Sequence, residues 1–285
     1  MKKILQRLLI FFLGLPVLIV IVFFLPAYNH LCLNLLVIIF SILGALEFQN
    51  ILRHKSLFVP PIEAAILGGL VPVLETAVIS FGMDRFIVFA VFMAAASWLF
   101  VSRVFSARDK QDQFINRTAA GFYIMLYPGI FLAWIISMAL FPEPGIVIIA
   151  FLLTVFLNDS AAWAAGMLFG KGNRGIIPAS PNKSAAGFIG GILASVLTGV
   201  LCVLFFPQAF RGAIPALPSG AILGLATGIA AVLGDLGESV LKRSAGIKDS
   251  GVIIPGRGGI LDSIDSIALA APVFYIAYKL LFSLQ

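Results

Sequence analysis

Residues 145–170 read GIVIIAFLLTVFLNDSAAWAAGMLFG, an almost continuous apolar run. An α-helix needs about 20 predominantly apolar residues to cross the hydrocarbon core of a bilayer, and this run is long enough. A membrane-spanning β-strand would instead alternate between polar and apolar residues over about ten positions, whereas this run is apolar on all sides. The stretch therefore predicts a transmembrane helix, which we place at residues 146–170.

The rest of the chain has the same character. Of its 285 residues, 61% are hydrophobic and only 11% are charged, whereas about a quarter of the residues of a soluble domain are charged. The first apolar run follows MKKILQR, but no small-residue cleavage site comes after it, so we interpret it as a retained helix rather than a signal peptide. In addition to the helix at 146–170, eight helices are predicted, and the first apolar run is one of them. They lie at residues 5–25, 31–52, 62–81, 86–105, 119–140, 184–206, 219–241 and 266–283. We expect an all-α polytopic membrane protein with about nine transmembrane helices.

Basic residues are distributed unequally between the two sets of loops that nine helices would create. Sixteen lysines and arginines fall in one set and only three, Arg85, Arg211 and Lys279, in the other. Because cytoplasmic loops of membrane proteins carry the excess of Lys and Arg, we expect the N-terminus in the cytoplasm and the C-terminus on the opposite side. The net charge of +6 is then mostly a topology signal, and nucleic acid is not an expected partner.

The two halves of the chain differ in their polar content. Residues 1–140 should form about five transmembrane helices, and residues 141–285 the remaining helices together with a site that faces the cytoplasm. In the first half, Glu47 and Glu75 lie in apolar sequence and should face the interior of the bundle, because a carboxylate that faces lipid is costly. A structural role, as a protonated or a hydrogen-bonded carboxyl group, is favoured for both, and a functional role stays open.

Residues 158–191 form the first polar segment of the second half. Asn158 and Asp159 interrupt an apolar helix, where a carboxylate is expensive unless it is paired or binds a cation. The loop that follows contributes Ser180 and Lys183. Small residues come next, among them Gly187, Gly190 and Gly191. These glycines either allow a ligand to approach the backbone or only allow two helices to pack tightly.

Residues 234–266 form the second polar segment and hold nine of the 32 charged residues of the chain. Four polar residues share one face of the predicted helix, at positions i, i+3, i+4 and i+7: Asp235, Glu238, Ser239 and Lys242. Asp262 and Asp265 lie three residues apart at the start of the last helix. Between the two groups, the glycines of PGRGG (255–259) could present backbone N–H groups to an anion. A solvated loop with ion pairs at the helix ends is the alternative.

This combination of side chains suits chemistry at phosphorus. Carboxylate oxygens are the ligands that Mg²⁺ prefers, and Mg²⁺ also binds phosphate oxygens. Phosphoryl-group chemistry depends mainly on positioning and charge stabilisation, which lysines and backbone N–H groups supply. The sequence has no GxxxxGK[ST] loop and no GxSxG motif, and neither histidine is near the polar segments.

The residues of both segments resemble those of the CDP-diacylglycerol synthases, also called phosphatidate cytidylyltransferases. The signature of that family runs approximately S-x-x-K-R-x(4)-K-D-x(5)-P-G-H-G-G-x-x-D-R-x-D. The matching residues here are Ser239, Lys242, Arg243, Lys248, Asp249, Pro255 to Gly259, Asp262 and Asp265. Upstream, the similar residues are Gly234 to Leu236, Glu238, Asn158, Asp159, Phe169, Gly170 and Ser180 to Lys183. The resemblance covers roughly residues 155–270.

The resemblance implies a nucleotidyltransferase that condenses CTP with phosphatidic acid in phospholipid biosynthesis, giving CDP-diacylglycerol and pyrophosphate. It implies catalytic roles for Asp235, Lys242, Asp262 and Asp265, with Asp235 and Asp262 as ligands of Mg²⁺ and a second cation such as K⁺ left open. The residues implied in substrate binding are Asp159, Ser180, Lys183, Glu238, Ser239, Arg243, Lys248 and Arg257. CTP, phosphatidic acid and membrane lipids are the expected partners, and a homodimer is left open.

Some positions depart from the family pattern. Arg257 stands where the family usually has histidine, and Ser263 where it usually has arginine. The usual K-T-W-E-G appears as KSAAG at residues 183–187, with Ala185 and Ala186 in place of the aromatic and the acid. A relative acting on another lipid phosphate or a polyprenol, and a non-catalytic scaffold or transporter with this fold, are therefore the alternatives. A bacterial inner membrane, with the site facing the cytoplasm, is the expected location.

Overall fold

The computed structural model describes residues 14–102, 104, 114–212, 215–254 and 258–282. The chain packs as two compact units. The first unit comprises residues 1–137 and 244–263, and the second unit comprises residues 138–243 and 264–285. The segment 244–263 therefore packs with the N-terminal helices, although the residues on either side of it belong to the second unit. The division at residue 140 that the sequence suggested stays a prediction.

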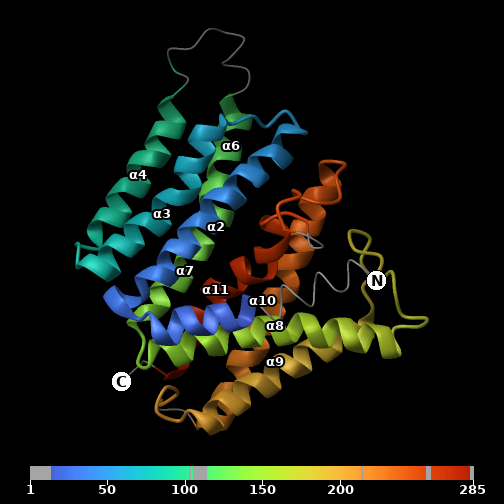
Figure 1. The fold of residues 1–285 in the computed structure, drawn as a ribbon. Coiled ribbons are helices and arrows are strands. Elements are labelled where there is room, and N and C mark those ends of the chain that lie inside the picture. Colours follow the sequence, from blue (N-terminus) through green and yellow to red (C-terminus); the bar gives the residue numbers. More distant parts are fainter. Residues whose placement is uncertain (1–13, 103, 105–113, 213–214, 255–257, 283–285) are drawn as a thin grey trace. The chain divides into compact units, whose positions relative to one another are not determined.

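The described part of the chain is built from helices and contains no β-strand (Figure 1). In the first unit these are a helix at Gly14–Phe24, α2 (Ala27–Arg53), α3 (Pro61–Phe81), α4 (Phe86–Val101), α6 (Phe114–Ile124), the π-helix η1 (Met125–Ile130) and α7 (Phe131–Ser137). The second unit contains the 3₁₀ turn η2 (Met138–Leu140), α8 (Pro144–Phe169), α9 (Ala185–Phe205), α10 (Ala216–Ser244) and most of α11 (Leu261–Phe282).

Seven of the described helical stretches are long and apolar enough to cross a membrane, counting residues 114–140 as one, and two shorter apolar helices accompany them. The prediction of an all-α polytopic membrane protein is confirmed, and the protein is an integral membrane protein. The predicted first helix (5–25) lies partly outside the described residues, which show its part at Gly14–Phe24. The sidedness of the two termini stays a prediction.

The helix boundaries follow from local chemistry. Pro61 and Pro144 occupy the first turns of α3 and α8, where the missing N–H of proline costs nothing. Gly82 ends α3 with a φ of 71°, a left-handed conformation that glycine adopts without strain. At the start of α2, residues Tyr28 to His30 are also left-handed, so the regular helix begins at residue 31, where the apolar run places it.

In the first unit, α2 and α3 pack against the π-turn of η1. The Ser41 hydroxyl lies 2.7 Å from the Gly68 carbonyl oxygen and also contacts the Pro128 carbonyl oxygen in η1. Pro128 has no backbone N–H, which explains why regular α-helical hydrogen bonding is interrupted here. Glu75, only 6% exposed, accepts hydrogen bonds from Arg85 (2.7 Å) and Ser137 (2.6 Å). The predicted inward orientation of Glu75 is thus confirmed.

In the second unit, small residues allow close helix packing. A methyl group added at Gly187 or Gly191 would lie about 3 Å or less from backbone oxygens of α8. Gly224 of α10 lies so close to α9 that a methyl group there would overlap the Ser195 carbonyl group. Of the two interpretations of the glycines after Lys183, the structure supports tight helix packing, the usual role of small residues between membrane helices.

Candidate active site

Four carboxylates gather in the second unit. Asp265 on α11 lies close enough to interact electrostatically with Asp159 on α8 and with Asp235 and Glu238 on α10. The N–H of Ser266 donates to the Oδ1 atom of Asp265 at 2.6 Å. Like charges repel strongly where water is scarce, so four acids at one place need compensating positive charge.

Two lysines supply part of this charge. Lys183 forms an ion pair with Asp235, and both side chains are less than one third exposed. Lys242 forms an ion pair with Glu238 one helical turn away, and the side chains are 11% and 0% exposed. The predicted shared face of α10 is confirmed for Glu238 and Lys242, because the i, i+4 spacing brings them into contact. The Lys183–Asp235 pair joins the two polar segments of the sequence.

A compact loop positions Lys183. Its N–H donates to the Ser180 carbonyl oxygen (3.1 Å), and its own carbonyl oxygen accepts the N–H of Gly175 (3.3 Å). The next residue, Ser184, is the N-cap of α9, and its hydroxyl oxygen accepts the Gly187 N–H at 3.1 Å. Capping of this kind satisfies an N–H group that would otherwise lack a partner in the helix. Lys183 is therefore held directly before a well-defined helix start.

Asp159 lies on the same helix as Asn158 but has different contacts. The Asn158 amide donates to the Ser195 hydroxyl at 2.8 Å and is 1% exposed, so it holds α8 against α9. The Ser266 hydroxyl lies 3.5 Å from both Asp159 oxygens, a long contact at the limit of a hydrogen bond. Ser266, whose role no sequence pattern indicated, thus lies between Asp159 and Asp265.

The remainder of the signature lies in the first unit and centres on Asp262 in the first turn of α11. Its Oδ2 atom accepts hydrogen bonds from the Ser250 N–H (3.0 Å), the Ser250 hydroxyl (2.9 Å) and the Gly259 N–H (2.7 Å). These three donors fix the orientation of the Asp262 carboxylate. Ser250 was not singled out in the sequence, because a lone serine between charged residues carries no specific pattern.

A second carboxylate, Glu47 of α2, binds the same loop. It is 5% exposed and accepts hydrogen bonds from the N–H groups of Ile260 (3.0 Å) and Leu261 (2.8 Å). The Ser250 hydroxyl, 3.0 Å away, is also within hydrogen-bonding distance of Glu47. The predicted inward orientation and hydrogen-bonded role of Glu47 are confirmed, but the partner could not be read from the sequence.

These contacts correct one expectation. The N–H groups of the Gly-rich turn were expected to be available to an external anion. Instead, the N–H of Gly258 donates to the Ile254 carbonyl oxygen at 3.0 Å, and those of the next three residues donate to Asp262 and Glu47. The anions at this turn are the carboxylates of the protein itself. Arg257 and the first residues of the turn lie outside the described residues.

Three further predicted site residues lie on α10 or in the loop after it. Ser239 is partly exposed on α10, whereas Arg243 at the end of α10 and Lys248 in the loop are exposed. Asp235 belongs to the second unit and Asp262 to the first, so their joint role as metal ligands stays a prediction. Among the residues that the structure describes, no group of three or more Asp, Glu, His or Cys side chains is arranged to hold a metal ion.

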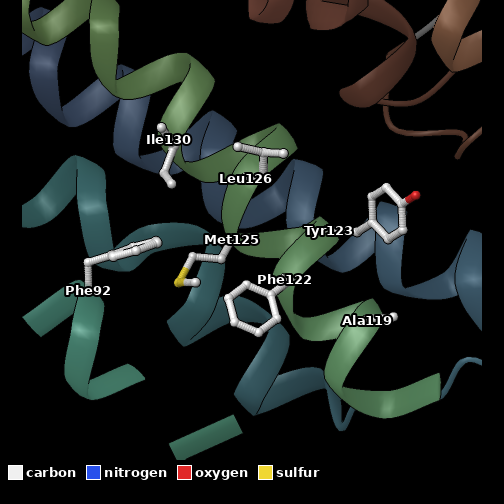
Figure 2. Close-up of a pocket in the computed structure, with 7 residues that line it drawn as sticks. All are labelled: Phe92, Ala119, Phe122, Tyr123, Met125, Leu126 and Ile130. Carbon is white, nitrogen blue, oxygen red and sulfur yellow. The ribbon is translucent and has the colours of Figure 1, made fainter. Parts of the chain in front are cut away.

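The first unit contains two cavities that are mostly apolar. A cavity of about 250 Å³ lies between Phe92 of α4 and residues of α6 and η1. Figure 2 shows the side chains that line it, including Phe122 and Met125. A neighbouring cavity of about 340 Å³ is also mostly apolar and is bordered by Glu75 and Arg85. Both cavities lie among apolar helices of the first unit, and their lining includes no residue of the two polar segments.

Taken together, the helices and the buried carboxylates and lysines define an integral membrane protein with a charged site among its spanning segments. The chain matches the cytidylyltransferase family over residues 5–281, nearly its whole length, and it belongs to this family. Enzymes of this class transfer a cytidylyl group.

Individual relatives carry a more specific name. The chain is 34% identical to a phosphatidate cytidylyltransferase of Thermotoga maritima, over 61% of this chain and 64% of that protein. It is 36% identical to the phosphatidate cytidylyltransferase of Haemophilus influenzae over 48% of this chain and 47% of the relative. The protein of that name in Helicobacter pylori is 40% identical over 51% of this chain and 52% of its own length. The aligned regions thus span about half to two thirds of these relatives.

Proposed function

We propose that the protein condenses CTP with phosphatidic acid and releases pyrophosphate, giving CDP-diacylglycerol for phospholipid synthesis. Membership of the cytidylyltransferase family and the names of the relatives support this reaction. The observation that carries the proposal is the ion pair between Lys183 and Asp235, because it brings the two polar segments together beside Asp159 and Asp265. A group of lysines and carboxylates is the arrangement that phosphate chemistry requires.

The proposed reaction is a displacement at phosphorus. A phosphate oxygen of phosphatidic acid attacks the α-phosphorus of CTP, and a new P–O bond forms as the bond to the bridging oxygen of pyrophosphate breaks. The nucleophile is already anionic, so no strong general base is needed. Both histidines of the chain belong to the first unit, whereas the acidic cluster belongs to the second. Lys183 and Lys242 would stabilise the negative charge on the phosphates.

The donor chemistry of the site fits a divalent cation. Asp235, Asp262 and Asp265 offer hard carboxylate oxygens, and Mg²⁺ is usually held by one or two carboxylates together with waters and substrate phosphates. A ready cage of three protein ligands is therefore not required. When bound, Mg²⁺ would neutralise phosphate charge. A second cation such as K⁺ is part of the same proposal, as is a location in a bacterial inner membrane with the site facing the cytoplasm.

The test is incorporation of labelled CTP into lipid by the purified protein, with phosphatidic acid, in the presence and absence of Mg²⁺. The expected result is metal-dependent CDP-diacylglycerol with an equal amount of pyrophosphate. A parallel reaction with polyprenyl phosphate tests whether Ala185 and Ala186 accompany a different acceptor. Product only from the polyprenyl acceptor would overturn the choice of lipid, and no product from either, with CTP bound, would overturn the enzymatic proposal.

A further inference from the structure

The loop before α11 is held by a carboxylate that lies more than 200 residues earlier in the sequence. Glu47 contacts Ser250, Ile260 and Leu261, at sequence separations of 203, 213 and 214 residues. All of these residues belong to the first unit. A carboxylate with several N–H and O–H donors is strongly bound, because hydrogen bonds to a charged group are stronger than those between neutral groups.

The backbone of the loop follows the shape of this carboxylate. At Gly251 and at Gly259, a methyl group would overlap the Glu47 carboxyl oxygens. Both glycines therefore lie directly against the Glu47 carboxylate, and Gly259 also donates its N–H to Asp262. Gly251 and Gly259 thus leave space for an acidic side chain of α2.

Glu47 and Asp262 accept hydrogen bonds from neighbouring donors at the start of α11. The three consecutive N–H groups of Gly259, Ile260 and Leu261 are divided between them, and the Ser250 hydroxyl lies 3.0 Å from Glu47 and 2.9 Å from Asp262. The three N–H groups lie at the N-terminal end of α11, where negative charge is stabilised by the helix dipole. Any displacement of Glu47 would therefore change the position of Asp262.

We propose that Glu47 is a positioning residue of the catalytic site. It holds Ser250, Ile260 and Leu261 at the start of α11, and through them the carboxylate of Asp262. Glu47 itself touches neither substrate nor cation. The inference rests on the proposed function, in which Asp262 binds the divalent cation.

The experiment uses full-length Glu47→Gln, and Glu75→Gln as the matched control. In both variants an amide replaces a buried carboxylate of the first unit, but Glu75 contacts Arg85 and Ser137 instead of the loop. In Glu47→Gln, the new amide group would direct its own N–H donors at the N–H groups of Ile260 or Leu261. Glu47→Asp keeps the charge on a side chain that is one methylene shorter, and it is expected to retain part of the anchoring that Glu47→Gln loses.

Two readouts are independent of turnover. Hydrogen–deuterium exchange of the peptide containing Ile260 and Leu261 should be about tenfold faster in Glu47→Gln, because exchange requires these N–H groups to lose their acceptor. The dissociation constant of Mn²⁺, used alone as a probe of the divalent site, should rise about 10- to 100-fold, the usual effect of losing a group that orients a metal ligand. Neither quantity should change in Glu75→Gln.

Unchanged exchange in Glu47→Gln would overturn the anchoring role. If exchange is faster in Glu47→Gln but its dissociation constant for Mn²⁺ equals that of Glu75→Gln, then Glu47 has a purely structural role. That result would also overturn the inference. If Glu47→Gln does not fold, Glu47→Asp decides by the same two criteria. Wild-type protein that binds Mn²⁺ but makes no CDP-diacylglycerol would refute the proposed function, while the exchange and Mn²⁺ results would still decide the role of Glu47.

Discussion

The buried ion pair of α10 gives a prediction that separates stability from activity. Glu238 and Lys242 are 0% and 11% exposed in their side chains. Lys242→Met leaves the Glu238 carboxylate buried without its partner lysine, and breaking a buried pair in this way costs about 3–5 kcal/mol. With a shift of about 2 °C per kcal/mol for a chain of this length, the apparent melting temperature should fall by roughly 6–10 °C.

The matched variant is Glu238→Gln combined with Lys242→Met. Both charges are then removed with little change in volume, so most of the lost stability should return. Activity should not return, because Lys242 is proposed to stabilise phosphate charge. Incorporation of labelled CTP into lipid measures the activity of all three proteins.

Unfolding can be followed with a thiol-reactive dye in detergent. Cys202 is buried and becomes reactive when the second unit opens, whereas Cys32 is exposed and can be replaced by serine beforehand. A double variant as unstable as Lys242→Met would show that the isolated charge of Glu238 is not the cause. A double variant with wild-type turnover would refute the phosphate-binding role of Lys242.

Four further predictions concern single substitutions. Asp235→Asn and Asp262→Asn should each abolish CDP-diacylglycerol synthesis while the protein still elutes as a folded species in size-exclusion chromatography, and wild-type turnover in either variant would contradict its role as a metal ligand. Arg257→His should retain synthesis, because the family usually has histidine there, and complete loss would assign arginine a distinct role. Gly224→Val should lower the melting temperature markedly, because its side chain would overlap the Ser195 carbonyl group of α9. On the same helix, Gly237→Ala meets no atom within 4 Å and should be neutral or stabilising by about 1 kcal/mol.

Much of the fold could be predicted because membrane helices follow directly from apolar length. The predicted helices at 62–81 and 184–206 agree with α3 and α9 within a residue at each end. The contact of Glu238 with Lys242 was predictable for a similar reason, since spacing along one helix determines it. Local rules of this kind need no knowledge of tertiary structure.

The rest depends on contacts between distant parts of the chain. The pairing of Lys183 with Asp235 has no signature in spacing, and only the resemblance to a family suggested that the two segments act together. The donors that bind Glu47 are backbone N–H groups, which every residue except proline carries, so the sequence could not single them out. The sequence likewise allowed the glycines of the turn to present N–H groups to an anion, whereas the N–H groups of Gly258 and Gly259 donate to the Ile254 carbonyl oxygen and to Asp262.

The packing of residues 244–263 with the N-terminal helices has a consequence for how this chain can be divided. A fragment beginning at residue 138 would contain every position of the C-terminal signature, yet it would lack Glu47 and the helices against which the signature loop packs. The N-terminal half is therefore not an interchangeable membrane anchor. Grafting the last four helices onto an unrelated transmembrane scaffold should transfer the signature without its activity, unless an acidic side chain is supplied to take up the place of Glu47.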